Sequence, residues 1–170
     1  VMEITSDNYL DVSEMTVIVI FEATAVDTDQ VLISSLSGTD GFANVLNSDY
    51  SILTYQQYSS DILNEVGQYE IRTNAVNMAV SMFDDETQAI QLNGSYSIEA
   101  DITGAGIYQE NYISIGAAFD STDYSDYFTG KIKEIIMYDA KLDTADLRVL
   151  NQYAREKWGV YIIDQQIFFE

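Results

Sequence analysis

The sequence predicts an all-β domain with one short α-helix near its C-terminal end, and three observations support this fold class. Short apolar runs recur through the first 138 residues, separated by clusters of Gly, Ser, Asn and Asp, which is typical of strands and their turns. The pattern then changes to apolar residues at helical spacing, between a capping residue and a glycine. A length of 170 residues fits a single domain with a substantial core.

Strands are predicted where β-branched and aromatic residues are dense. Residues 16–21 (Thr-Val-Ile-Val-Ile-Phe) form a continuous apolar run, which predicts a strand buried on both of its faces. Asn93-Gly94 predicts a tight hairpin turn between strands at 89–92 and 96–98. The other predicted strands lie at 31–34, 67–72, 78–82, 112–115 and 131–138.

The helix is predicted at 143–158 from local signals alone. Asp143 is a favourable N-cap, and Leu142 and Leu147 occupy the N′ and N4 positions of a hydrophobic staple. Gly159 suits the C′ position, and basic residues in the last turn suit the negative end of the helix dipole. One apolar stripe should face a core: it consists of Leu147, Leu150, Ala154 and Trp158.

Several motifs together resemble one family. They are Asp7–Leu10, Met15–Ala23, Gln91-Leu-Asn-Gly94, Ile113-Ser-Ile-Gly116, Phe128-Thr-Gly130, Tyr138-Asp-Ala-Lys-Leu142 and Lys157-Trp-Gly159. In this order they resemble the laminin-G-like (LamG) domains of the concanavalin A-like lectin/glucanase superfamily, over residues 5–160. The resemblance implies an antiparallel two-sheet jelly-roll sandwich that recognises ligands at surfaces.

The resemblance also implies the domain organisation. Residues 1–161 would form the laminin-G-like sandwich, and residues 162–170 an apolar tail that such domains usually lack. An apolar tail must bury itself somewhere. We expect it to form an added strand on its own sheet or to contact a partner subunit, together with the C-terminal helix.

Charge is strongly uneven along the chain. The formal net charge is −21. Residues 1–130 hold 21 acidic side chains and one basic side chain, Arg72, which gives a net charge of −20. Residues 131–170 hold seven acidic and six basic side chains, which gives a net charge of −1. Such a field disfavours nucleic acid and anionic membranes, and favours cations, basic partners or a saline medium. A helix that spans a membrane needs about 20 consecutive apolar residues. No apolar stretch in the sequence approaches this length, so we expect no membrane insertion.

Composition excludes several catalytic chemistries. Without cysteine or histidine, disulfides, the usual zinc sites and histidine-based catalysis are absent. Glucanases that share the resembled fold use Glu-x-Asp-x-x-Glu on one strand. This chain offers Glu99-Ala-Asp101-Ile-Thr-Gly104, in which glycine replaces the acid that would protonate the leaving group. We therefore predict no catalytic residues. An active glycosidase, suggested only by Glu99 and Asp101, is the least favoured alternative.

One acidic loop offers candidate ligands. Asp120, Asp123 and Asp126 lie within seven residues and supply the hard oxygen donors that Ca²⁺ prefers. The alternative is a solvated loop, since an acid-rich chain produces such clusters by chance. Asp27-Thr-Asp29 is a second, weaker cluster. Calcium is therefore the one cofactor considered.

Tyrosines indicate a binding surface. Among the 13, Tyr50, Tyr55 and Tyr58 are assigned to one loop, and Tyr124 and Tyr127 to another. Tyrosine provides rigid amphipathic area for stacking on sugars or for packing at protein interfaces. Because Tyr124 and Tyr127 accompany Asp123, we predict the ligand site there.

These observations favour a non-catalytic recognition or adhesion module. Its partner would be a glycan or a surface protein, and its setting an extracellular or virion-surface protein. The alternative is a structural or decoration protein of a virion or another extracellular assembly, in which the sandwich is a building block.

Overall fold

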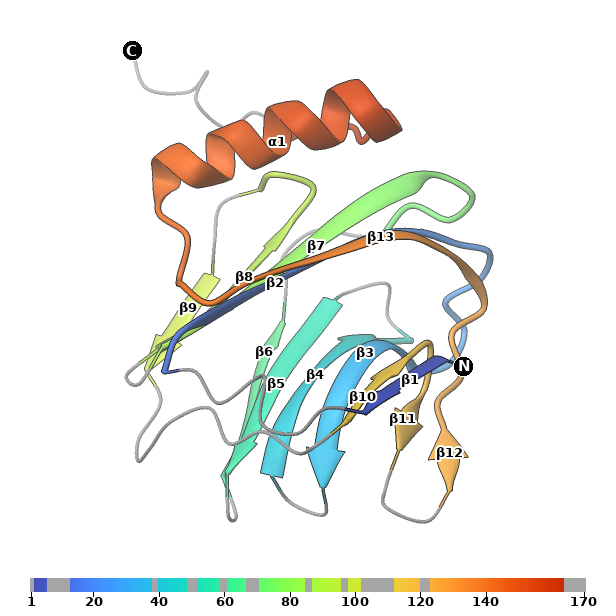
Figure 1. Cartoon of the computed structure of the whole chain (residues 1–170). Helices are drawn as coiled ribbons and strands as arrows, with labels where there is room; N and C mark the ends of the chain where they lie inside the picture. Colours follow the sequence, from blue (N-terminus) through green and yellow to red (C-terminus); the bar gives the residue numbers. More distant parts are fainter. Residues whose placement is uncertain are drawn as a thin grey trace.

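A computed structural model describes residues 2–5, 13–37, 40–48, 52–58, 61–66, 71–84, 87–95, 98–101, 112–119 and 123–163. Two antiparallel sheets face each other, and a single helix lies on the outside of one of them (Figure 1). The predicted all-β sandwich with one C-terminal helix is confirmed. The predicted opening strand at Asp7–Leu10 lies outside the described residues.

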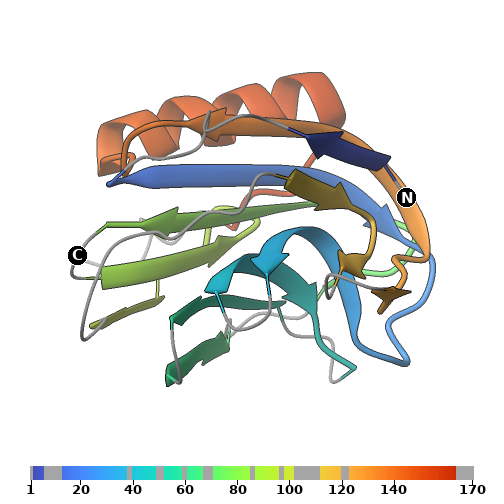
Figure 2. The same cartoon turned by 60° about the horizontal axis from the view of Figure 1, so that its bottom comes forward.

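The six-stranded sheet has the order β1-β10-β3-β4-β5-β6, with every neighbour antiparallel. Strands β3 to β6 follow one another as successive hairpins, and this sheet comes forward in Figure 2. Its strands are β1 (Met2–Thr5), β3 (Gln30–Ser37), β4 (Asp40–Leu46), β5 (Ile52–Tyr58), β6 (Asp61–Val66) and β10 (Tyr112–Ile115).

The five-stranded sheet has the order β13-β2-β7-β8-β9 and is also antiparallel throughout. It joins segments far apart in the chain, since Tyr138 of β13 pairs with Thr16 of β2. Its strands are β2 (Met15–Ala23), β7 (Val76–Phe83), β8 (Thr87–Leu92), β9 (Ile98–Asp101) and β13 (Gly130–Tyr138).

Strand β2 contributes to two cores, which explains its unbroken apolar run. Its odd-numbered residues, such as Val19 and Phe21, point between the sheets and pack with Phe42 and Phe83. Its even-numbered Ile18 and Ile20 join a second core, between the sheet and the helix. Successive strand residues point to opposite faces, so a strand covered on both sides is apolar at every position. The prediction of a strand buried on both faces is confirmed.

Two assignments from the sequence differ from the structure. Residues 67–72 were predicted as a strand; residues 67–70 lie outside the described part of the chain, and Ile71 and Arg72 do not belong to a strand. The Arg72 N–H donates to the Asn77 side chain at 3.2 Å, and the Arg72 carbonyl accepts from it at 2.8 Å. Tyr55 and Tyr58, predicted in a loop, belong to strand β5, while Tyr50 is outside the described residues. Strand β5 pairs on both sides, with β4 and β6, and its Ile, Thr and Tyr residues are of types that strands favour.

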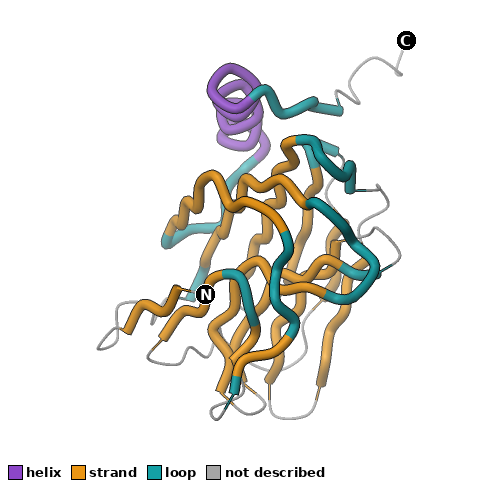
Figure 3. The backbone as a smooth tube through the Cα atoms, turned by 90° about the vertical axis from the view of Figure 1, so that its right-hand side faces the viewer, coloured by secondary structure: helices purple, strands orange, loops and turns teal. Residues whose placement is uncertain are grey.

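Helix α1 (Thr144–Trp158) covers the outer face of the five-stranded sheet, as Figure 3 shows from the side. The Asp143 carboxylate accepts hydrogen bonds from the Ala145 and Asp146 N–H groups at 2.7 and 2.9 Å, and Gly159 ends the helix at φ 68°. Leu147, Leu150 and Ala154 are buried against the sheet. Both predicted helix boundaries are confirmed. This described helix is not long and apolar enough to cross a membrane.

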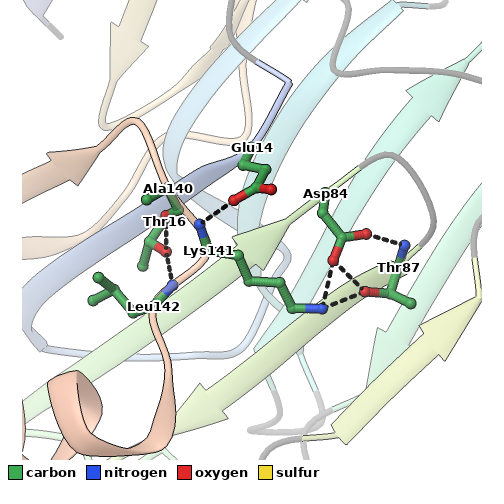
Figure 4. A network of polar contacts seen from close by, with 7 residues as sticks. All are labelled: Glu14, Thr16, Asp84, Thr87, Ala140, Lys141 and Leu142. Atoms are coloured by element: carbon green, nitrogen blue, oxygen red, sulfur yellow. Dashed lines mark hydrogen bonds and ion pairs between the residues drawn. The ribbon is translucent and has the colours of Figure 1, made fainter.

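The connection from β13 to α1 is held by polar contacts with β2, with β8 and with Asp84 in the turn between β7 and β8 (Figure 4). The buried Thr16 hydroxyl donates to the Ala140 carbonyl at 2.7 Å and accepts from the Leu142 N–H at 3.1 Å. The Lys141 ammonium lies 2.7 Å from the Asp84 carboxylate and also donates to the Thr87 hydroxyl. These contacts fix the direction in which the chain enters the helix.

Asn93 and Gly94 form the predicted turn of the β8–β9 hairpin, both with positive φ (52° and 72°). The Asn93 side chain accepts from the Met78 N–H at 2.7 Å, which ties the turn to β7. A Cβ on Gly94 would stand 2.6 Å from the side chain of Ile162, and the Ile163 N–H donates to the Asn93 carbonyl at 2.7 Å. The start of the tail therefore packs on its own domain, whereas its remaining residues, 164–170, lie outside the described part of the chain.

Candidate ligand-binding site

A short hairpin carries the first predicted site residues. Strands β11 (Ala118–Phe119) and β12 (Tyr124–Ser125) pair with Phe119 opposite Tyr124, and their ring centroids are 4.8 Å apart. Ala118 packs on a small cluster formed by Val31, Ala43 and Val45. Tyr124 is thus half-buried and supports the hairpin. Sequence reasoning missed its partner Phe119, because nothing local indicates that the two rings meet.

Beyond β12 the chain turns Tyr127 outward. Asp126 adopts a left-handed conformation (φ 49°), and its carbonyl accepts from the Val31 N–H at 2.8 Å. Tyr127 then forms a parallel bridge with Val31, and its side chain is 56% exposed. The next residue, Phe128, points inward and meets Phe21 edge-to-face at 6.1 Å. This alternation presents the Tyr127 ring to solvent from a well-anchored backbone.

A buried amide joins this segment to a second loop. The Gln30 side chain donates to the Ala25 carbonyl at 2.9 Å and accepts from the Thr129 N–H at 2.7 Å, while the Thr24 N–H donates to the Thr129 carbonyl at 2.9 Å. Residues 24–31 and 123–129 therefore lie side by side at one end of the sandwich, and we call them together the acidic rim. Gln30 carries no sequence signal that sets it apart from other polar residues at the start of a strand.

The acidic rim exposes four carboxylates: Asp27, Asp29, Asp123 and Asp126. Three of these carboxylates accept hydrogen bonds from described residues. Asp123 accepts from the Tyr124 N–H at 2.8 Å, Asp126 from the Ser125 hydroxyl at 3.0 Å, and Asp29 from the Ser48 N–H at 3.0 Å. Asp123 and Asp126 thus accept hydrogen bonds within their own segment, whereas Asp29 links its segment to Ser48, which follows β4.

The calcium set stays a prediction. Asp120 lies outside the described residues, whereas Asp123 and Asp126 are described. Within the described part of the chain, no three acidic side chains are grouped closely enough to hold a metal ion. Asp123 and Asp126 are brought to the same rim as Tyr127, so the predicted ligand residues are neighbours in space.

The acids of the glucanase-like motif lie elsewhere. Glu99 and Asp101 belong to β9, the edge strand of the five-stranded sheet, where their backbones pair with Ala89 and Thr87. Gly104 is outside the described residues.

A second polar cluster joins β13 to the helix. The Glu134 carboxylate accepts hydrogen bonds from Trp158 at 2.6 Å, Tyr153 at 2.7 Å and Lys157 at 2.9 Å. Partial burial opposes the charge on Glu134, but the bonds from Lys157, Trp158 and Tyr153 outweigh it and lower the pKa of this carboxyl. The hydrogen bonds of Lys157, first to Glu134 and then to Tyr153, raise the pKa of its ammonium group. All the donors belong to this protein, so the cluster is a structural clamp.

Two facing antiparallel sheets of this kind define the class of jelly-roll β-sandwich domains. A laminin-G family model, described as the concanavalin A-like lectin/glucanases superfamily, matches residues 2–148, and the chain belongs to this superfamily. The resemblance stated from the sequence is thereby confirmed. A comparison with curated proteins gives no match.

Solved structures share the fold at low sequence identity. The CBM40 of the Ruminococcus gnavus IT-sialidase, bound to α2,3-sialyllactose, is similar with a TM-score of 0.72 and 15% identity, over 82% of this chain and 83% of that one. The binding domain of botulinum neurotoxin DC in complex with rat synaptotagmin II has a TM-score of 0.69 and 12% identity, over 89% and 39%. A SAP-like pentraxin from Limulus polyphemus has a TM-score of 0.64 and 14% identity, over 88% and 81%.

Proposed function

We propose that this protein is a non-catalytic recognition module that binds a glycan at the acidic rim. The observation that carries the proposal is Tyr127, a ring 56% exposed on a backbone fixed by the Val31–Asp126 hydrogen bond. A rigid exposed ring offers a sugar an apolar face to stack on, and it is already ordered before the ligand arrives. The flanking carboxylates of Asp123 and Asp126 are acceptors for sugar hydroxyls.

The comparisons support a binding role. Both the R. gnavus module and the botulinum domain are binding domains, and the first was solved with a sialylated sugar. The fold alone does not decide function, so the proposal rests on the rim, with these neighbours as support. In the same way we propose an extracellular or virion-surface setting, where such a module would meet its ligand.

Two experimental steps test this function. The purified chain is first applied to an array of immobilised glycans. The affinity of each glycan that binds is then measured by titration for the wild-type protein and for Tyr127→Ala. Loss of a stacking ring at the centre of a site should weaken binding about tenfold or more. The control is Tyr138→Ala, an exposed tyrosine at the far end of β13, roughly 25 Å along the strand from Gly130. Equal effects of the two substitutions would contradict the assignment of the rim.

A protein partner is the second candidate. It is favoured by the botulinum neighbour, whose binding domain was solved with synaptotagmin. If no glycan binds, capture of a surface protein that depends on Tyr127 would support this candidate instead. The assembly alternative also remains a proposal. It expects copies of the chain to contact one another through helix α1 and the residues that follow it.

A further inference from the structure

We propose that Asn93-Gly94 is a site of spontaneous modification, at which Asn93 deamidates and thereby releases the C-terminal residues from the β8–β9 turn. The site lies outside the acidic rim, and the proposal does not depend on glycan binding. It rests on the sequence of the turn, on the hydrogen bonds of the Asn93 amide, and on the contact of the turn with Ile162 and Ile163.

The sequence of the turn supplies the reactive groups. Asn93-Gly94 is the one Asn-Gly pair in the chain. The backbone nitrogen of the glycine can attack the side-chain carbonyl carbon (Cγ) of the asparagine, because glycine has no side chain to hinder the approach. A C–N bond forms, the amide nitrogen leaves as ammonia, and the product is a five-membered cyclic imide. Water then opens the imide on either side, which gives aspartate or isoaspartate.

The folded protein holds the Asn93 amide away from this reaction. Asn93 is 3% exposed, its Oδ1 accepts from the Met78 N–H at 2.7 Å, and its Nδ2 donates to Asn77 Oδ1 at 3.0 Å. Attack at Cγ makes this carbon tetrahedral and expels Nδ2, so the reaction disrupts both hydrogen bonds in a place where water does not replace them. Deamidation therefore requires a local opening of the turn, and its rate follows the population of the open state.

The C-terminal residues cover the turn from outside. The Ile163 N–H donates to the Asn93 carbonyl at 2.7 Å. The side chain of Ile162 lies over Gly94, where an added Cβ would be 2.6 Å from its Cγ2 atom, and it also packs on the core beneath helix α1. Opening of the turn disrupts both contacts, so residues 162 and 163 control how often the reactive state forms.

The product does not fit the position that the asparagine occupies. Asn77 is fixed, because its Nδ2 donates to the Arg72 and Ala75 carbonyls at 2.8 and 2.9 Å, and its Oδ1 accepts from the Arg72 N–H. An aspartate at position 93 would place a carboxylate oxygen against Asn77 Oδ1, and neither atom carries a proton to share. Burial of charge in such a contact is destabilising. Isoaspartate would instead add a carbon to the backbone of the turn, so either product should release the C-terminal residues.

The kinetics of the wild-type protein test the protection by the fold. Samples are incubated at neutral pH in buffer and in urea, and their peptides are analysed by mass spectrometry for aspartate and isoaspartate at position 93. We expect conversion in buffer to be at least about tenfold slower than in urea, since the reaction waits for local opening. Equal rates would overturn the protective role of the fold, and no conversion in urea would overturn the reactivity of the pair.

Two alanine variants test the control by the C-terminal residues. Ile162→Ala removes the side chain over Gly94, so it should raise the rate in buffer several-fold and leave the rate in urea unchanged. Val149→Ala is the control, because it shortens a side chain that is 69% exposed on α1, and it should change neither rate. The same rate in buffer for Ile162→Ala and for the wild type would contradict the control by residue 162.

The product itself tests the consequence. Asn93→Asp should lower the melting temperature by several degrees relative to Asn74→Asp, which adds the same charge at an exposed residue whose φ is also positive (56°). If Asn93→Asp does not fold, the aged wild-type sample supplies the product, which ion exchange separates by its extra negative charge. This fraction should melt below the unmodified protein, and its Ile163 N–H should exchange faster with deuterium. Equal melting and equal exchange would overturn the proposed release.

Discussion

Single residues decide how closely the loops of this domain approach its sheets. Gly130 shows this best, because an added Cβ would lie 2.2 Å from the Glu22 carbonyl oxygen and 2.7 Å from the Phe128 ring. Gly116 differs, since its φ is +81° but a Cβ there would meet nothing within 4 Å. The first glycine is required by contact with β2, the second by its backbone conformation.

Alanine substitutions should distinguish these two roles. We expect Gly130→Ala to destabilise the fold by about 2 kcal/mol or more, because the backbone of β2 and the Phe128 ring stand too close to the added Cβ and must move. Gly116→Ala should lower the free energy of unfolding by about 1–2 kcal/mol, the strain of a left-handed residue with a Cβ. Urea unfolding of both variants checks the order. A smaller loss for Gly130→Ala than for Gly116→Ala would contradict the close contact with β2.

The site residues also differ from one another in a way that the sequence did not show. Tyr124 and Tyr127 look equivalent as a pair beside Asp123, yet Tyr124 stacks on Phe119 and Tyr127 faces solvent. Which ring is available depends on the pairing of β11 with β12 and on the Val31–Tyr127 bridge. The Val31–Tyr127 bridge joins residues far apart in the chain, which no local pattern encodes, and the β11–β12 hairpin has only two residues in each strand.

At the scale of elements, prediction succeeds where the determining contacts are local. Helix α1 was correctly bounded because its caps, staple and apolar stripe all lie within the segment itself. Strand β2 was identified because burial on both faces leaves an unbroken apolar run. Strands β4, β5 and β6 were missed because their short stretches mix apolar with polar residues and become strands through pairing with their neighbours.

The clamp between β13 and α1 should respond to acid. The pKa of Glu134 is lower in the folded than in the unfolded protein. The ionised carboxylate therefore stabilises the fold fully at pH values above its unfolded pKa of about 4.3. This stabilisation is lost as the pH falls from there through the folded pKa. Trp158, the chain's only tryptophan, donates to this carboxylate and reports the change by fluorescence.

Glu134→Gln isolates this contribution from the other acids. The difference in unfolding free energy between wild type and variant should be largest near neutral pH and shrink below about pH 4. The folded-state tryptophan emission of the wild type should shift over the same range, while that of the variant should not. A difference that is constant with pH would mean that Glu134 does not act through its charge.

At the scale of the whole molecule, charge dominates. A net charge of −21, with −20 in residues 1–130, opposes the compact state through self-repulsion. The two hydrophobic cores must exceed this repulsion, and the described ion pairs of the basic residues, such as Lys141–Asp84 and Lys157–Glu134, offset only part of it.

Salt should therefore stabilise the protein. Raising NaCl from about 0.02 M to about 0.5 M shortens the screening length well below 10 Å, and the melting temperature should rise by several degrees. Calorimetry or circular dichroism melts provide the measurement. Melts in calcium chloride at matched ionic strength separate screening from ion binding, since a bound ion adds stability beyond the sodium curve. A melting temperature independent of NaCl would contradict the role given to self-repulsion.

The pairing of β13 with β2 also governs how this chain can fold during synthesis. β2 leaves the ribosome before both of its neighbours, because β7 begins about 50 residues later and β13 more than 100 residues later. Until β13 is made, the most apolar of the described strands keeps at least one unpaired edge, which is a condition that favours aggregation. A nascent chain that ends before Gly130 lacks both β13 and the helix, so the C-terminal third releases this strand from its exposed state.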